Sequence, residues 1–397
     1  MQPKVRENLL LVELACKGAV TRTDVRNFDL TYVVDKAIEN SIFLHAYRAL
    51  EGVAIEEPNG WRHVSRLYFQ YTANLARWFD ESVKLASLFR EHGLSVMPVK
   101  GVLLAHLYYP DRFLRFSSDM DFVFKTAAGK AKADGLLSQR GYRLIWSSPK
   151  ESEYLKHLGR VSIHCETHSF IASLSGTYEY PILKGLWAGS SLRGVGGVEM
   201  NVMRPEHALM ILCLHTFSEG IFSLRDLSDA HHILNDRSRF QWDVVAHHAL
   251  EEGWKQILHL PLNIIAATLK RFTGETSIPE RVLGLVHSGS ANRNSVDIVR
   301  EILEHRGWTF PVLVSSFPLP SPLLRSPYLL NVIAPRAGPQ TMLNSLKRAL
   351  WELYQIFAMV VRDYGSRYGL RCLRRWVETY ILSPPVSGSI REWVLSL

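Results

Sequence analysis

Apolar residues recur at intervals of three and four along the first ninety residues, which is the spacing of amphipathic helices. The spacing is clearest from Tyr68 to Ala86. It changes after the helix-stopping Gly93, where residues 94–99 form a short, partly β-branched apolar run. We therefore predict a helical N-terminal region over residues 1–89, followed by a buried strand.

Short helix and strand patterns alternate over the next hundred residues. Helices are expected at 102–108, ended by Pro110, and at 127–140, closed by Gly141; strands are expected at 94–99, 115–124, 142–146, 160–167 and 198–203. The Arg204-Pro205-Glu206 segment then resembles a helix start, and helical spacing continues towards the C-terminus. The pattern predicts an α+β domain over residues 90–203 and a helical domain over residues 204–397.

Two stretches of the C-terminal domain stand out. Seven prolines fall between Pro311 and Pro339, so this stretch cannot be a regular helix, and we expect an ordered arm on the surface. Residues 346–376 mix aromatic and basic side chains. That mixture suits a helix with one buried face, and it also suits a surface that binds nucleic acid.

Charge and composition narrow the class of protein. A formal net charge of +8 favours anionic partners such as nucleotides, polyphosphates or nucleic acid. No stretch reaches the ~18 uninterrupted apolar residues of a membrane-spanning helix. The cysteines, Cys16, Cys165, Cys213 and Cys372, lie far apart without zinc-type spacing. We expect a cytoplasmic protein with reduced thiols and no membrane span.

A pair of aspartates lies in the predicted strand 115–124, RFSSDMDFVF. Alternate residues of a strand share a face, so Asp119 and Asp121 point the same way, roughly 6.5 to 7 Å apart. Like charges inside an apolar strand are costly unless a cation neutralises them. The pair predicts a site for Mg²⁺, which prefers carboxylates and leaves positions for phosphate oxygens. Solvated aspartates on an edge strand remain the alternative.

Lys100-Gly101 lies between a predicted strand and a predicted helix. Gly101 permits close backbone approach, while the helix N-terminus and the Lys100 ammonium face the same anion. Arg115 supplies a guanidinium fork for phosphate oxygens, although a surface salt bridge explains it equally well. Beside the aspartates, these residues predict a triphosphate site.

These pieces occur in an order that resembles a known family, the uncharacterised nucleotidyltransferases of the DNA polymerase β-like superfamily. The matching segments are Val99-Lys100-Gly101, Tyr109-Pro110-Asp111, Arg115, Ser118-Asp119-Met120-Asp121-Phe122-Val123 and Ile163-His164-Cys165-Glu166. The resemblance implies a polymerase β-like core, a mixed sheet flanked by helices. It also implies Mg²⁺ or Mn²⁺ on acidic residues and transfer of a nucleoside monophosphate from a triphosphate such as ATP, with pyrophosphate leaving. Lys100, Gly101, Arg115 and Ser118 would bind the nucleotide.

The third acidic residue departs from the family pattern. Family members carry an acid two positions before the strand histidine, where this chain has Ser162. Glu166 lies on the same predicted strand face as Ser162 and His164, so it can replace that acid. We therefore expect Asp119, Asp121 and Glu166 to be the catalytic and metal-binding residues, with a surface role for Glu166 as the alternative.

The acceptor of the nucleotidyl group is not evident from the sequence, and a small molecule, a peptide or a protein all fit. His215, Arg225 and Asp229 resemble family positions beside the cleft, or they form a structural hydrogen-bond network. Two other functions stay open. One is a non-catalytic nucleotide-binding or interaction protein, favoured by Ser162, and the other is an RNA-modifying transferase, favoured by the basic C-terminal segment.

Overall fold

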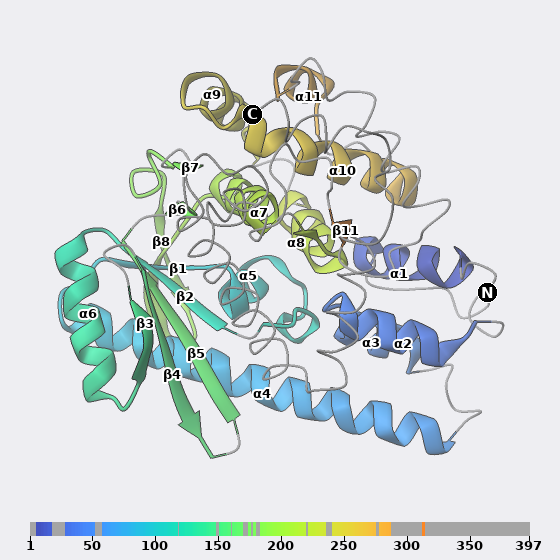
Figure 1. Cartoon of the computed structure of the whole chain (residues 1–397), viewed down its shortest axis with the longest axis horizontal. Coiled ribbons are helices and arrows are strands. Elements are labelled where there is room, and N and C mark those ends of the chain that lie inside the picture. Colours follow the sequence, from blue (N-terminus) through green and yellow to red (C-terminus); the bar gives the residue numbers. More distant parts are fainter. Residues whose placement is uncertain are drawn as a thin grey trace, which may run out of the picture. The chain divides into compact units, whose positions relative to one another are not determined.

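The computed structural model (Figure 1) describes residues 5–17, 28–51, 58–117, 119–147, 151–159, 161–169, 174–175, 178–179, 183–219, 221–235, 240–274, 278–286 and 312–313. By its contacts the chain divides into two units, residues 1–173 with 179–317 and residues 174–178 with 318–397. Apart from residues 174–175 and 178, the features below belong to the first unit. Ser118, Cys372, the basic segment 346–376 and the proline-rich segment apart from residues 312–313 lie outside the described residues. The boundaries after residues 89 and 203 stay predictions.

The helices are α1 (Val5–Lys17), α2 (Leu30–Glu39), α3 (Phe43–Leu50), α4 (Pro58–Glu91), α5 (Gly101–Tyr108), α6 (Ala127–Gln139), α7 (Pro205–Glu219), α8 (Leu224–Leu234), α9 (Trp242–Glu251), α10 (Lys255–Thr273) and α11 (Glu280–Val286). The strands are β1 (Val96–Val99), β2 (Asp119–Phe124), β3 (Arg143–Ser147), β4 (Glu151–Leu158), β5 (Val161–His168), β6 (Leu174–Ser175), β7 (Tyr178–Glu179), β8 (Ser191–Val195), β9 (Val198–Val202), β10 (Ile221–Phe222) and β11 (Val312–Leu313), with a 3₁₀ turn at Arg112–Leu114.

A mixed five-stranded sheet with the order β1-β2-β5-β4-β3 forms the centre of the α+β fold. β2 and β5 are parallel, and the other neighbours in this sheet are antiparallel. In an antiparallel sheet each strand can follow its neighbour through a tight turn, whereas the parallel pair needs the long connection that α6, β3 and β4 provide. The mixed α+β class predicted from the sequence is confirmed.

Helices α4 and α6 cover one face of the sheet (Figure 1). The Phe89 ring of α4 packs edge-on against Phe122 and Phe124 of β2, at centroid distances of 5.5 and 5.1 Å. Asp134 of α6 accepts a hydrogen bond of 2.7 Å from Thr167 of β5. Because successive strand residues point to opposite faces, this packing directs Asp119, Asp121 and Glu166 to the other face.

Several predicted elements are confirmed with small shifts. Pro205 stands at the first position of α7, where its missing N–H is no loss. Gly141, at φ 80°, follows α6 as expected for a residue that must adopt a positive φ. The strand predicted to begin at residue 115 begins instead at Asp119, because Arg112–Leu114 form a 3₁₀ turn capped by the Asp111 side chain.

Strands β4 and β8 and the two-residue strands β6, β7, β10 and β11 are missing from the sequence prediction. β4 lies inside the sheet between β5 and β3, yet its buried positions include Ser152. That hydroxyl is paired, because the Lys130 ammonium of α6 donates to it at 2.6 Å. A polar residue at a buried position interrupts the alternation by which a strand is recognised.

The C-terminal helices pack on each other and on the N-terminal helix. α7 contacts α8 and α10, and α1 contacts α8 and α10. α8 begins with a capping box in which Ser223 and Asp226 each accept a hydrogen bond from the other's backbone N–H. Within the ranges that the structure describes, no helix combines the length and hydropathy needed to cross a membrane.

Candidate functional site

Lys100 and Gly101 join β1 to α5 in a strained turn. Lys100 adopts φ 55° and ψ −157°, a region that is nearly restricted to glycine and costs on the order of 1–3 kcal/mol for other residues. A Cβ on Gly101 would lie 3.0 Å from the Asp119 carbonyl oxygen and 3.1 Å from the Ser117 hydroxyl. The chain therefore needs glycine at position 101. The turn brings the Lys100 ammonium to 3.7 Å from Asp121 Oδ1.

The two aspartates of β2 lie beside β5 in a defined register. Asp119 is paired with His164, and Asp121 with Glu166. Asp121 is 3% exposed, and neither of its carboxylate oxygens accepts a hydrogen bond from any residue that the structure describes. Its buried charge is offset by the Lys100 ammonium at 3.7 Å and by His168 at 3.6 Å, both beyond hydrogen-bond distance, so the oxygens keep their capacity to bind a further cation. This is the environment that suits a divalent metal ion.

The carboxylates at this site perturb one another. Burial and the neighbouring Asp121 charge raise the pKa of Asp119. Burial also opposes ionisation of Asp121, but Lys100 and His168 outweigh it and lower the pKa of that carboxyl. Burial and both aspartates raise the pKa of Glu166 to about 7, against the contribution of His168. Burial is thus the main cause of the raised pKa at Asp119 and Glu166, and the neighbouring carboxylates add to it.

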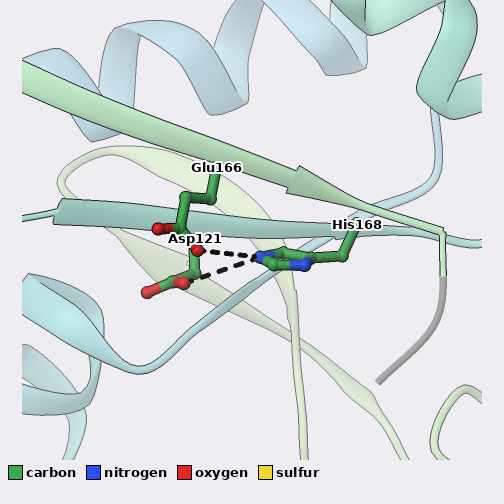
Figure 2. Close-up of side chains that lie close together, drawn as sticks. All are labelled: Asp121, Glu166 and His168. Atoms are coloured by element: carbon green, nitrogen blue, oxygen red, sulfur yellow. Dashed lines mark ion pairs between the residues drawn. The ribbon is translucent and has the colours of Figure 1, made fainter. Parts of the chain in front are cut away.

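His168, at the end of β5, is a site residue that the sequence prediction missed. Its Nε2 atom lies 3.4 Å from Glu166 Oε2 and 3.6 Å from Asp121 Oδ1 (Figure 2). Burial alone would lower the pKa of His168. Asp121 and Glu166 outweigh burial and raise that pKa from 6.5 to about 9. The signal was present in the sequence, because the alternation that groups Ser162, His164 and Glu166 reaches His168 two residues later.

Glu166 and Ser162 occupy different ends of the site face of β5. Glu166 stands directly beside Asp121 in the parallel register, and it lines the cavity described below. The Ser162 hydroxyl instead lies 3.1 Å from His157 Nδ1 of β4. The structure therefore brings Glu166, rather than position 162, to the aspartates.

Arg115 lies at the cavity wall, but most of its guanidinium is engaged by Asp229 of α8. Nε donates to Asp229 Oδ1 at 2.7 Å, and Nη2 donates to Oδ2 at 2.8 Å. The Tyr109 hydroxyl donates to the same Oδ1 at 2.6 Å. Arg115 is 6% exposed. The structure thus brings Arg115 near the site while directing its bidentate fork away from any phosphate.

Arg225, the second residue of α8, lines the cavity as Arg115 does. Its Nε atom is buried without a hydrogen-bond partner among the described residues, and its Nη2 atom lies 3.9 Å from Asp226 Oδ1. The Arg225 charge also opposes the rise in the pKa of Asp119. Arg115 acts on Asp119 in the same way, but Arg115 is engaged in the bidentate pair with Asp229.

A cavity of about 350 Å³ is lined by most of these residues, and Asp121 lies buried beside it in β2, between the lining residues Asp119 and Val123. Its lining comes from the β1–α5 turn, from β2 and β5, and from α7 and α8, and the charged or polar members are Lys100, Arg115, Ser117, Asp119, Glu151, Glu166, His168, His215, Arg225, Asp226 and Asp229. The volume lies in the range of small-molecule sites. Apolar residues such as Leu104 and Ile211 complete the lining, so a ligand meets both charged and apolar side chains.

A comparison with known families agrees with this arrangement. A family model described as "Uncharacterised nucleotidyltransferase" matches residues 26–270. The match includes the β1–α5 turn, both strands that carry the carboxylates, and the helices α7 and α8 that complete the cavity. No curated protein matches the chain.

Proposed function

Because the chain belongs to this nucleotidyltransferase family, whose members transfer phosphorus-containing groups, we propose a metal-dependent reaction at the cavity of β2 and β5. A nucleoside monophosphate passes from a nucleoside triphosphate, with ATP as the first candidate, to a small-molecule, peptide or protein acceptor. Pyrophosphate leaves. We also propose a polymerase β-like core, which the mixed sheet and the paired carboxylates of β2 support.

The observation that carries the proposal is the state of Asp121. Its two oxygens are buried and accept no hydrogen bond from the residues that the structure describes, while Asp119 and Glu166 crowd beside it. Oxygen ligands of this kind fit Mg²⁺ or Mn²⁺. Asp119, Asp121 and Glu166 would hold the ion. When bound, it supplies the positive charge that offsets both the carboxylates and the phosphate oxygens of the substrate.

Two positively charged groups are placed to bind the triphosphate. Lys100 lies at the N-terminus of α5, so its ammonium and the first backbone N–H groups of that helix face the same anion. Arg225 faces the cavity from α8 and contributes a guanidinium, which suits phosphate oxygens. Ser118, outside the described residues, keeps its proposed place in the nucleotide site. Arg115 acts in our proposal by holding α8 against the core through Asp229.

The transfer itself requires one bond to form and one to break. The acceptor oxygen bonds to the α-phosphorus, and the bond from that phosphorus to the bridging oxygen breaks. The electron pair of the broken bond leaves with pyrophosphate, whose charge Lys100 and Arg225 stabilise. The acceptor proton passes to Glu166, directly or through a water.

The test is incubation of the full chain with ATP, GTP, CTP or UTP and Mg²⁺ or Mn²⁺, with candidate acceptors present. Pyrophosphate release and mass spectrometry together report the reaction, because a transferred nucleotide adds its monophosphate mass to the acceptor or to the protein. We expect Asp119→Asn with Asp121→Asn to reduce pyrophosphate release by about 10³-fold or more, since removal of charges that act in the transition state has effects of this size.

Asp243→Asn is the matched control, because the Asp243 side chain is 85% exposed and lies on α9, outside the cavity lining. It should keep full activity. Pyrophosphate release that survives in the double variant would show that another site catalyses the reaction.

A further inference from the structure

His168 adds a nitrogen atom to a group of oxygens that is otherwise suited to Mg²⁺. One ligand atom from each of Asp121, Glu166 and His168 lies within 4.8 Å of the others. All three side chains lie on one sheet face and converge on the same point (Figure 2). The histidine side chain is 16% exposed, so the sheet and its neighbours hold the imidazole in place.

The two distances are too long for direct hydrogen bonds, and they lie near the upper end of the separation expected for shared coordination of one ion. A charged N–H···O bond between imidazole and carboxylate is about 2.7–2.9 Å long. The Nε2 atom of His168 lies 3.4 and 3.6 Å from its two carboxylate neighbours. Two atoms that bind one ion at about 2.1 Å each lie roughly 3.0–3.5 Å apart. Asp121 provides an independent indication, because its buried oxygens have no hydrogen-bond donor within the described ranges.

The identity of the third ligand decides which ions the site favours. Mg²⁺ takes oxygen ligands and gives up its waters reluctantly, so an imidazole is a poor ligand for it. Mn²⁺ accepts carboxylate oxygen readily and, like the later first-row ions, also accepts imidazole nitrogen. One imidazole nitrogen added to the carboxylate oxygens of the site therefore makes a mixed donor set, which Mn²⁺ accepts more readily than Mg²⁺.

We propose that His168 is a nitrogen ligand of the metal ion at this site, and that it makes the site prefer Mn²⁺ over Mg²⁺. The inference rests on the proposed function for the location of the metal, and it adds the ligand and the selectivity. His164, two residues earlier on the same strand face, lies 3.3 Å from Glu153 of β4 instead. It is a matched histidine that should not bind the ion.

The experiment uses the full chain with Mn²⁺ alone, and pulsed EPR detects any ¹⁴N nucleus bound to the manganese. We expect ¹⁴N coupling in the wild type and in His164→Gln, and its loss in His168→Gln. Competition titrations should give a Mn²⁺ dissociation constant about tenfold or more below that of Mg²⁺, and His168→Gln should weaken Mn²⁺ binding by a similar factor.

A second variant keeps the test decisive if His168→Gln folds poorly. His168→Asp replaces nitrogen with oxygen, so it should lose the ¹⁴N coupling and shift the preference towards Mg²⁺. Bound Mn²⁺ without ¹⁴N coupling in the wild type, or coupling that persists without His168, would overturn this inference alone. Absence of nucleotidyl transfer with every ion would instead overturn the proposed function, while the EPR result would still stand.

Discussion

Two clusters of buried charge, built from neighbouring stretches of the chain, differ in whether hydrogen bonds stabilise the buried carboxylate. In the first, Arg115 of the loop before β2 makes a bidentate pair with Asp229, and Tyr109 donates a third hydrogen bond to the same carboxylate. In the second, a few residues later, Asp121 has buried oxygens without a hydrogen bond from the described part of the chain. We call them the Arg115 cluster and the Asp121 cluster.

The pKa values of the carboxylates show what the difference means. Burial raises the pKa of Asp229, but Arg115 outweighs it, and the pKa lies below its usual range. Burial and Asp121 raise the pKa of Asp119. Ionised Asp229 therefore stabilises the fold, whereas ionised Asp119 destabilises it until a cation binds. The Arg115 cluster holds α8 against the core, whereas the Asp121 cluster gains stability when a cation binds to it.

The largest expected effect on stability is neutralisation of Asp229. Asp229→Asn leaves the Arg115 charge buried without a counterion, which costs about 3–5 kcal/mol. Asp119→Asn has the same change of atoms but removes one of two repelling charges. In EDTA, its free energy of unfolding should equal or exceed that of the wild type. Urea unfolding of both variants measures the contrast.

A double-mutant cycle sharpens the result for the Arg115 cluster. Replacing both partners, as Arg115→Met with Asp229→Leu, removes the unpaired charge, so the double variant should be more stable than the sum of the single losses predicts. Losses of equal size for Asp229→Asn and Asp119→Asn would erase the distinction between the two clusters.

The next effect is a loss of stability in mild acid that originates at His45, a buried residue beside the Arg115 cluster. His45 of α3 is 1% exposed and lies 3.2 Å from the Ser228 hydroxyl, which neighbours Asp229. Burial lowers the pKa of His45 from 6.5 to about 4, and the adjacent His231 charge adds to this while Asp229 opposes it. The unfolded chain thus binds a proton between pH 6.5 and 4 that the folded chain does not. Stability falls as pH falls through this window.

From pH 7 to pH 5 the expected loss from His45 is roughly 2 kcal/mol. Urea unfolding at both pH values measures it, and His45→Gln should reduce the dependence by about that amount. The exposed His63, changed to Gln, is the matched control and should leave the dependence intact. An unaltered pH dependence in His45→Gln would place the titrating group elsewhere.

Local patterns predicted the parts of the site that lie within single elements. Alternation placed Asp119 and Asp121 on one face of β2, and the Lys100-Gly101 turn followed from a strand that ends where a helix begins. His168 was missed because the predicted strand ended one residue before it. The pairing of Arg115 with Asp229 links residues 114 positions apart, and no local spacing carries information about such a contact.

The smallest effect tests whether strain is stored at the Asp121 cluster. Lys100 adopts φ 55°, and glycine adopts this backbone region without the cost of a Cβ. Lys100→Gly should therefore raise the free energy of unfolding by about 1 kcal/mol, after the greater freedom of glycine in the unfolded chain is subtracted. Nucleotidyl transfer should fall about 10²-fold, because the ammonium that faces the phosphates is lost.

Lys100→Ala loses the same ammonium but keeps a Cβ, so its activity should fall equally without the gain in stability. If Lys100→Gly and Lys100→Ala had the same free energy of unfolding, the turn at Lys100 would hold no strain.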